Sequence, residues 1–481
     1  VSVQRLKCIR QSEACEIVRC ASDFDNFQPT FAARVSVQRF ERLLLTMGRR
    51  HASAARLLVV AVAAAQRTCP AVDNDWTIDR FDRFAGAAAA IGCVLDDGEK
   101  NPASDCAPKP CLVGPEWDAL REEKGLTDLD RGKFFEVLVE MNDWLTSAIQ
   151  VHLVTILARD MLGYRVRTLH RTDSKFSFER LASGAIAMNP EIWGHASTKL
   201  EQFRKYVLSE DPCVLTHFNG VTADQKFYAP TYVASGICES YSAVKTNPKE
   251  VRDTVAPRDG ATNVTDAMRA QCEINVWPRS ECVDGRWLPP VCTKYPYEPG
   301  GPSPQCSEIL MGSPLWATSW FEAAVRNLGL NYTMLYHPSL RDEILRRYAD
   351  AENFVFYWYE PDLLLQEIEV NPLSLPQWSE RCAKEYDIEP LDSGVACALR
   401  PDALIAGINA KVAEKEPDLR HLHETFQWEP GQLEAIISSV GKGQDAANAT
   451  CNWLKANVET WTQSVAHVPD SSSSSSSSKS D

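Results

Sequence analysis

Apolar residues recur along the chain with a period of two in some stretches and of about four in others. The first such region reads as a β-α-β-α-β unit, because short alternating or β-rich runs predict strands and four-residue spacing predicts one face of a helix. The helical spacing is carried by Leu145, Ile149, Leu153, Leu157 and Met161, and Gly163 follows as a natural helix end. The unit comprises a strand at 134–141, that helix, a strand at 164–169, a helix at 176–183, a strand at 185–188 and a turn at 189–193.

The same order of elements returns later in the chain. It comprises a strand at 308–311, a turn at 312–314, a helix ending near Gly329, a strand at 332–336, a helix at 340–351, a strand at 354–358 and a turn at 359–361. Both units place tryptophan after the first strand (Trp144, Trp316) and after the third (Trp193, Trp358). Loops after the carboxyl ends of strands in an open α/β sheet are where ligands bind. The pattern therefore predicts an α/β protein of two lobes with a ligand cleft between them.

Four indoles in those loops, with Tyr357 and Tyr359 beside them, favour a particular class of ligand. A quaternary ammonium cation has no hydrogen-bond donor, and the negative faces of aromatic rings attract it. An anionic group on the same ligand would suit the free N–H groups that open a helix, for example at Ala317 and Thr318. The alternative for each indole is ordinary core packing, since the chain has 13 tryptophans and most indoles are largely buried.

At these residues the chain resembles the substrate-binding proteins of glycine betaine/proline betaine ABC transporters, the OpuAC/ProX-like family. The resemblance runs from about residue 134 to residue 461. The matching segments are NDWLTSAIQVHLVTILARDMLGYRV, FERLASGAIAMNPEIWGH, KFYAPTYV, GSPLWATSWFEAAVRNLGL, FVFYWYEPDLL and ATCNWLKANVETW. The resemblance implies a type II periplasmic-binding-protein-like fold, in which two α/β lobes joined by a hinge close on an aromatic cage.

The resemblance also implies roles for individual residues. Trp193 and Trp316 correspond to cage members, and either Trp358 or Tyr359 to a third. The backbone of Ala317 and Thr318 corresponds to the carboxylate site. The family often places a histidine four residues after the first-lobe tryptophan, whereas here His195 follows by two, so a surface-turn histidine is the alternative reading.

Charge and cysteine content limit the ligands and the cellular compartment that suit the protein. The chain has 481 residues, 44% of them hydrophobic, which is a globular composition, and a net charge of −15 argues against non-specific binding of nucleic acid. Its 16 cysteines indicate either an oxidising compartment or metal binding. They lack CxxC spacing, so disulfides are the expected use, especially in an insertion at about 238–306 that holds Cys272, Cys282 and Cys292. His421 and His423 could bind a metal, but their charged helical surroundings predict a solvated face.

The region after Met47 has the features of a secretory leader: three arginines, a nine-residue apolar run from Leu57 to Ala65, and small residues up to Ala71. A buried helix is the alternative. Residues 1–71 carry 11 basic and 5 acidic side chains and 4 cysteines, so their removal would leave 12 cysteines and a net charge of −21. Sequons at Asn263, Asn331 and Asn448 allow N-glycosylation and agree with secretion.

These signals together predict the organisation of the chain. The expected parts are an upstream segment at 1–46, a signal peptide at 47–71, a Cys-containing extension at 72–130, a two-lobed binding domain at 131–465 and a Ser-rich tail at 466–481. Lobe 1 is expected at 131–220 with the C-terminal helices added, and lobe 2 at 221–375.

No catalytic motif accompanies the aromatic pattern: the sequence has no Gly-x-Ser-x-Gly, His-Glu-x-x-His or Walker A sequence. We therefore expect a secreted, monomeric, non-enzymatic binding protein for a quaternary ammonium compound, without a cofactor, metal, nucleic acid or transmembrane segment. An ABC permease is a partner that only the resemblance implies. The alternatives are a secreted interaction protein that keeps the fold without the ligand, and a secreted hydrolase.

Overall fold

The structure is a computed structural model, and all the residues it describes fall in one compact unit within residues 69–481. The described residues are 109–126, 136–171, 174, 176–194, 197–233, 264–273, 282–283, 285–293, 306–313, 320–384 and 393–466. The expected leader, upstream segment and Ser-rich tail lie outside them. So do five residues singled out from the sequence: His195, Asn263, Trp316, Ala317 and Thr318.

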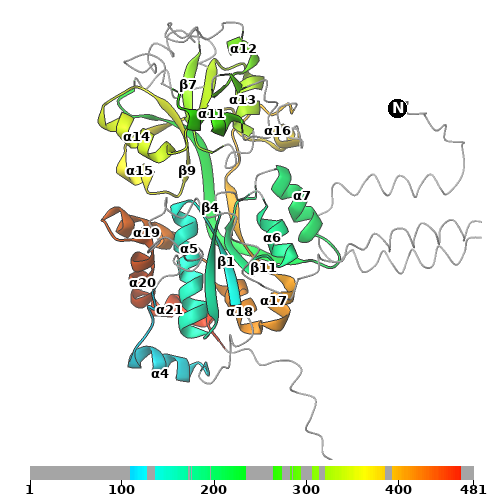
Figure 1. The fold of residues 1–481 in the computed structure, drawn as a ribbon, viewed down its shortest axis with the longest axis vertical. Coiled ribbons are helices and arrows are strands. Elements are labelled where there is room, and N and C mark those ends of the chain that lie inside the picture. The colour runs from blue at the N-terminus through cyan, green and yellow to red at the C-terminus, as the bar shows by residue number, and fades with distance from the viewer. Residues whose placement is uncertain are drawn as a thin grey trace, which may run out of the picture. The chain divides into compact units, whose positions relative to one another are not determined.

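One sheet runs through the described unit, with strand order β2-β1-β3-β11-β4-β9-β7-β8-β6-β5 (Figure 1). We call lobe 1 the part built on one half of this sheet and lobe 2 the part built on the other. Lobe 1 contains β1 (Glu136–Asn142), β2 (Arg165–Arg171), β3 (Met188–Ile192), β11 (Asp402–Asn409) and the first half of β4 (Val214–Pro230). In it, β1 lies between β2 and β3 with parallel pairing on both sides, and β11 is antiparallel to β3 and β4.

Lobe 2 repeats this arrangement. It contains the second half of β4 with β5 (Cys282–Val283), β6 (Arg286–Trp287), β7 (Ser307–Met311), β8 (Tyr332–Tyr336), β9 (Val355–Glu360) and β10 (Val370–Leu373). Here β7 lies between β8 and β9 with parallel pairing, as β1 does between β2 and β3. The long strand β4 belongs to both lobes and is antiparallel to both β11 and β9 (Figure 1). The predicted class, two α/β lobes of the type II binding-protein kind, is confirmed.

Helices cover both lobes. Lobe 1 carries α5 (Leu145–Ile156), which continues as the π-helix η5 (Leu157–Met161), and α6 (Ser177–Ser183), α7 (Ser197–Tyr206), α17 (Ala410–Lys415), α18 (Pro417–Thr425), α19 (Gln432–Gly441), α20 (Ala446–Ala456), α21 (Val458–Trp461) and η8 (Thr462–Ser464). Lobe 2 carries α11 (Asp266–Glu273), α12 (Pro290–Thr293), α13 (Trp320–Leu328), α14 (Leu340–Ala349), α15 (Leu364–Glu367) and α16 (Glu380–Lys384). The helix α5 is buried nearly all round, between the sheet and the C-terminal helices α19 and α20.

Two sequence-based boundaries were wrong. The third strand of lobe 1 was expected at 185–188 with a turn at 189–193, but β3 is Met188–Ile192. Its polar residues Asn189 and Glu191 suggested a turn, whereas both side chains are buried and hydrogen-bonded. Likewise β9 continues through Tyr359 and Glu360, which were expected to form a turn, because both residues pair with β4.

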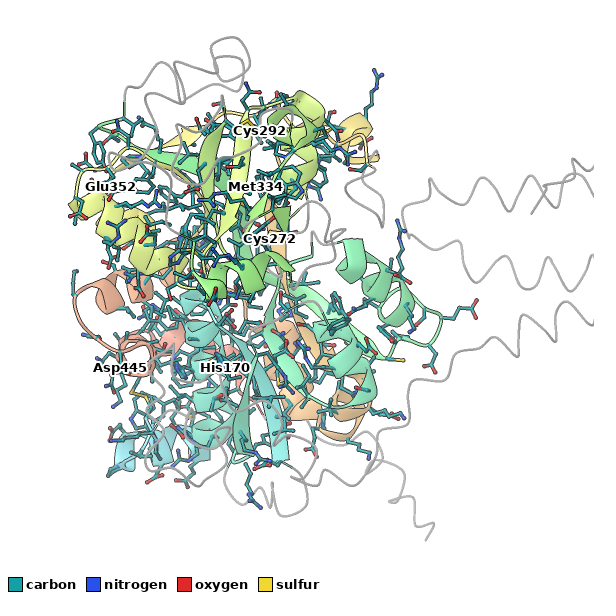
Figure 2. All side chains as sticks on the ribbon, turned by 45° about the horizontal axis from the view of Figure 1, so that its top comes forward. His170, Cys272, Cys292, Met334, Glu352 and Asp445 are labelled. Atoms are coloured by element: carbon teal, nitrogen blue, oxygen red, sulfur yellow. A yellow bond between two sulfur atoms is a disulfide. The ribbon has the colours of Figure 1, made fainter. Side chains whose placement is uncertain are left out.

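Disulfides hold loops and ends of this fold together, as predicted from the cysteine content. All nine cysteines in the described residues are disulfide-bonded. In the predicted insertion, Cys272 is bonded to Cys282 and Cys292 to Cys306; Figure 2 labels Cys272 and Cys292 in lobe 2. A further bond joins Cys382 to Cys397.

The longest disulfide loop joins Cys111 to Cys451 of α20, 340 residues apart. It attaches part of the N-terminal extension, including α4 (Pro115–Glu123), to lobe 1. The attachment is also non-covalent: the Asp160 carboxylate accepts the N–H of Cys111 at 2.7 Å, and the rings of Trp117 and Trp461 lie 6.1 Å apart. This part of the extension is therefore built into lobe 1.

Candidate functional site

Four of the aromatic residues singled out from the sequence gather where the two lobes meet. Trp144 follows β1 and precedes the first turn of α5, and Trp193 follows β3. Because β1 and β3 are parallel, both indoles lie at the same edge of the lobe 1 sheet. Trp358 and Tyr359 come from β9 of lobe 2.

The rings contact one another across the lobes. The ring centroids of Trp193 and Tyr359 are 5.7 Å apart and their planes are inclined at 82°, whereas Trp358 and Tyr359 are nearly parallel at 5.1 Å. All four side chains are less than 10% exposed. Rings inclined in this way present their faces in two nearly perpendicular directions, as two walls of an aromatic box do.

A buried carboxylate that the sequence reasoning missed holds the two indoles of lobe 1. Glu191 has no exposed surface, and its Oε1 accepts hydrogen bonds from Trp144 Nε1 (2.5 Å) and Trp193 Nε1 (2.8 Å). Oε1 also accepts from Thr146 Oγ1 at 3.0 Å, and Oε2 accepts from Gln150 Nε2. The pKa of Glu191 is raised, because the effect of burial outweighs that of these four hydrogen bonds, which lower it.

A second buried carboxylate has the same relation to the aromatic pair of lobe 2. Asp362 Oδ1 accepts from Trp358 Nε1 and from the backbone N–H of Leu364, each at 2.9 Å, and the Tyr359 hydroxyl also donates to this carboxylate. Burial raises the pKa of Asp362, which is 6% exposed. The sequence signals for these two residues were short: a Glu-x-Trp spacing on one strand and a Trp-Tyr-x-x-Asp spacing at the end of another.

Acidic side chains from both lobes act on Tyr359. Burial is the first cause that raises the pKa of its hydroxyl well above the usual value, and the charges of Asp362, Asp143 and Glu191 raise it further. Asp143 precedes Trp144 in lobe 1. Acidic side chains of both lobes therefore lie near the aromatic group.

Tyr357 lies apart from this group, although it is on the same strand. Its hydroxyl donates to Gln225 Oε1 at 2.5 Å, and its ring packs on Phe321 of α13 at 5.5 Å between centroids. Burial raises its pKa, and the charge of Glu322 raises it further. The contacts of Tyr357 place it in the core of lobe 2.

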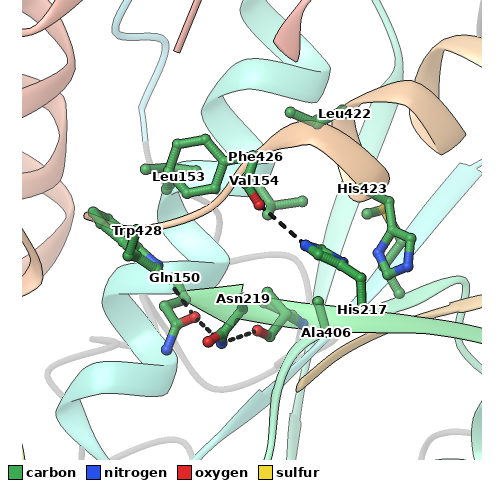
Figure 3. Close-up of a pocket in the computed structure, with 12 residues that line it drawn as sticks. Gln150, Leu153, Val154, His217, Asn219, Ala406, Leu422, His423, Phe426 and Trp428 are labelled. Atoms are coloured by element: carbon green, nitrogen blue, oxygen red, sulfur yellow. Dashed lines mark hydrogen bonds between the residues drawn. The ribbon is translucent and has the colours of Figure 1, made fainter. Parts of the chain in front are cut away.

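A small cavity of about 30 Å³, roughly the space of one water molecule, adjoins the site in lobe 1 (Figure 3). Gln150 connects the two: its Nε2 donates to Glu191, and its Oε1 accepts from Asn219 Nδ2 at 2.8 Å and from Trp428 Nε1 at 3.3 Å. The side chain of Gln150 is thus fixed at both ends, which fixes one donor to Glu191.

The other end of this cavity corrects the expectation for His423. This histidine was expected on a solvated helix face, but it is 4% exposed and its ring packs against His217 at 4.7 Å between centroids (Figure 3). Burial, together with the nearby His217, lowers the pKa of His423 to about 3. Its neighbour His421 lies at the surface, where its Nε2 is 3.0 Å from the backbone carbonyl oxygen of Gln463.

Neither a metal centre nor a membrane span is found in the described part of the chain. Among the residues whose positions are described, no three His, Cys, Asp or Glu side chains come close enough to hold a metal ion. No helix in the same residues has the length and apolar character needed to cross a membrane.

Two lobes of repeated topology, joined through β4 with aromatic side chains at their junction, define a two-lobed binding protein. The chain belongs to the OpuAC family, described as the substrate binding domain of the ABC-type glycine betaine transport system, whose profile matches residues 136–274 and 307–456. The family contains binding proteins and not enzymes. No curated protein sequence matches the chain.

Solved structures with a similar fold include three binding proteins of low sequence identity. Lactococcal OpuAC in its closed, glycine betaine-bound form is 13% identical, with a TM-score of 0.43, over 69% of this chain and 99% of that one. The glycine betaine/L-proline-binding protein ProX of Borrelia burgdorferi is 12% identical, with a TM-score of 0.44, over 70% and 97%. A choline-binding protein of an ABC transporter in complex with choline is 13% identical, with a TM-score of 0.42, over 69% and 93%.

Proposed function

We propose that the protein binds a quaternary ammonium compound of the betaine or choline type outside the cell, by closure of its two lobes on the cationic head. The observation that carries this proposal is the meeting of Trp144 and Trp193 from lobe 1 with Trp358 and Tyr359 from lobe 2. Three of these rings have their N–H edges hydrogen-bonded to buried carboxylates, which lie at the ring edges and do not cover the ring faces. A desolvated cation over an aromatic face gains about 2 kcal/mol.

Each lobe would contribute one wall of the site. Trp193 and Tyr359 come from different lobes, so separating the lobes separates these two walls. Binding then stabilises the closed arrangement because only that arrangement surrounds the ligand. Trp316, Ala317, Thr318 and His195, which are outside the described residues, remain proposed members of the same site.

Secretion and partners are further parts of the proposal. The disulfides fit an oxidising compartment, and an ABC permease is the partner that family membership suggests. Of the two described sequon asparagines, Asn448 is exposed at the first turn of α20, and Asn331 is half-buried before β8. Glycosidase treatment of the secreted protein, with Asn448→Gln as a comparison, would test the modification.

A second candidate, a secreted interaction protein without a small ligand, is favoured by one observation. The rings of Trp193 and Tyr359 are in direct contact and both are almost fully buried, as that alternative expects of a collapsed cleft. The first candidate expects a small ligand to act on this ring contact, and the second expects no such ligand.

Isothermal titration of the full chain with choline, glycine betaine and proline betaine would decide between them. We expect binding to at least one of these ligands, and loss of at least tenfold in affinity in Trp193→Ala and in Tyr359→Ala. Trp378→Ala is the matched control, because the Trp378 ring lies against Arg400 and not against the four site rings. Absence of binding at millimolar ligand would support the ligand-free alternative, and equal loss in the control would contradict the assignment of the binding site to these rings.

A further inference from the structure

We propose that Asn142, the last residue of β1, is a ligand-binding residue whose side-chain amide hydrogen-bonds the oxygen-bearing end of the ligand, beside the cationic head. This inference rests on the proposed function and adds a specificity-determining contact to it. The sequence pattern gave Asn142 no role, and for an anionic group of the ligand it suggested only the backbone of Ala317 and Thr318.

The side chain of Asn142 is fully buried and makes no hydrogen bond. Neither its Oδ1 nor its Nδ2 has a hydrogen-bond partner among the described residues. The backbone N–H of the same residue does have one, since it donates to Ser147 Oγ at 2.9 Å. A buried amide has lost its hydrogen bonds to water, so an amide without a protein partner destabilises the ligand-free protein.

The other buried amide side chains in the described part of the chain are hydrogen-bonded. They belong to Gln150, Asn189, Asn219, Gln225 and Asn409. For example, Asn409 Nδ2 donates to the carbonyl of Leu181 at 2.7 Å, and its Oδ1 accepts the N–H of Val412 at 3.1 Å. Asn142 is therefore an exception within this fold, and such an exception needs a specific explanation.

The equivalent position in lobe 2 shows that packing does not require an amide here. The strand β7 lies between β8 and β9 as β1 lies between β2 and β3, and its last residue is Met311, which is also fully buried. An apolar side chain thus fills the end of the central strand in lobe 2. A polar side chain that breaks this rule in lobe 1 indicates a functional position.

The position of Asn142 in the fold indicates which function that is. Ligands of open α/β sheets bind beside the carboxyl ends of the strands, and Asn142 is at that end of β1. Two residues later, Trp144 donates its indole N–H to Glu191 in the aromatic group. The charge of Asp143, which lies between them in the chain, raises the pKa of Tyr359 in lobe 2. The segment that begins at Asn142 therefore lies where the lobes meet.

The chemistry of the amide defines the ligand group that it suits. Nδ2 is a donor and Oδ1 an acceptor, and the group carries no charge. Nδ2 can donate to a hydroxyl or a carboxylate oxygen, whereas a quaternary ammonium head has neither a donor nor an acceptor. A ligand without an oxygen leaves the buried amide unpaired, which is how a site built for a hydrogen bond rejects an analogue that lacks it. Asn142 therefore favours ligands with an oxygen group over simple tetraalkylammonium ions.

The test is isothermal titration of the full chain with choline, glycine betaine and tetramethylammonium, which has the cation but no oxygen. Asn142→Leu replaces the amide with an apolar side chain of the same branching. We expect it to weaken the tighter bound of choline and glycine betaine at least about tenfold, and tetramethylammonium less than about threefold. Equal weakening of all three ligands, or of none, would overturn the inference and leave the proposed function intact. Failure of the unmodified protein to bind any of the three would overturn both.

The stability of the ligand-free protein separates a ligand contact from a structural role. Because the unpaired amide destabilises this form, Asn142→Leu should raise the midpoint of urea unfolding. Asn409→Leu is the matched control, since it removes a buried amide of the same lobe that is hydrogen-bonded, and it should lower the midpoint. A lowered midpoint in Asn142→Leu would overturn the inference, because the amide would then contribute to the stability of the free protein.

Discussion

Removal of the disulfide between Cys111 and Cys451 should cost this protein more stability than removal of any other described disulfide. In the chain-entropy description, a cross-link stabilises the native state by restricting the unfolded chain, and its effect increases with the logarithm of the loop length. For the 340-residue loop closed by Cys111–Cys451 this gives about 6 kcal/mol. For the 15-residue loop closed by Cys382–Cys397 it gives about 3 kcal/mol.

The measurement is urea-induced unfolding of two double variants, Cys111→Ala with Cys451→Ala and Cys382→Ala with Cys397→Ala. Tryptophan fluorescence reports on the attachment itself, because Trp117 of the extension packs on Trp461. We expect the first variant to be less stable than the second by about 3 kcal/mol. Equal stability of the two variants, or a more stable Cys111/Cys451 variant, would refute the reasoning that loop length determines the effect.

Three further predictions concern stability. Arg180→Met leaves the fully buried Glu140 without its cationic partner, now at 2.5 Å, and should cost about 3 kcal/mol in chemical unfolding; a cost below 1 kcal/mol would contradict this account. Gly220→Ala should cost at least about 2 kcal/mol, because φ is 96° and a Cβ would lie 2.2 Å from a backbone oxygen; Gly329→Ala, with positive φ but open space, should cost less. His423 binds a proton more readily when unfolded (pKa about 6.5) than when folded (pKa about 3), so its contribution to stability is complete above pH 6.5 and decreases as the pH falls towards 3. Urea unfolding should show this loss at roughly 1 kcal/mol per pH unit, and an unchanged slope in His423→Asn would contradict it.

The repeated order of strands and helices was predictable from the sequence because it depends on local periodicity. The helix at α5 and the strand at β8 lie where the spacing of apolar residues predicted them. The strand β3 was misplaced because Asn189 and Glu191 are polar, and a polar residue in a strand is interpretable only when its partners are known. Those partners come from other elements, for example Glu140 of β1.

The same reason limits what the sequence can indicate about the site. Tryptophans after strands are visible in the pattern, and the structure brings Trp144 and Trp193 together as expected. The carboxylates behind them are not visible, because a glutamate in a sequence is usually a solvated charge. His423 was misjudged for the same reason: its charged neighbours Arg420 and Glu424 on α18 are exposed, while its own ring lines the cavity with His217.

The strand β4 has a mechanical consequence for the movement of the lobes. Its residue Ala223 is the last to pair with β11 of lobe 1, and the next residue, Asp224, is the first to pair with β9 of lobe 2. No unpaired residue separates the two ladders, so rotation of one lobe against the other must twist a hydrogen-bonded strand. A continuously paired strand has a preferred twist, whereas a flexible linker would let the lobes rotate freely. In the proposed closure of the lobes, elastic energy in this strand would therefore add to the difference in free energy between open and closed lobes, and so to the apparent affinity for the proposed ligand.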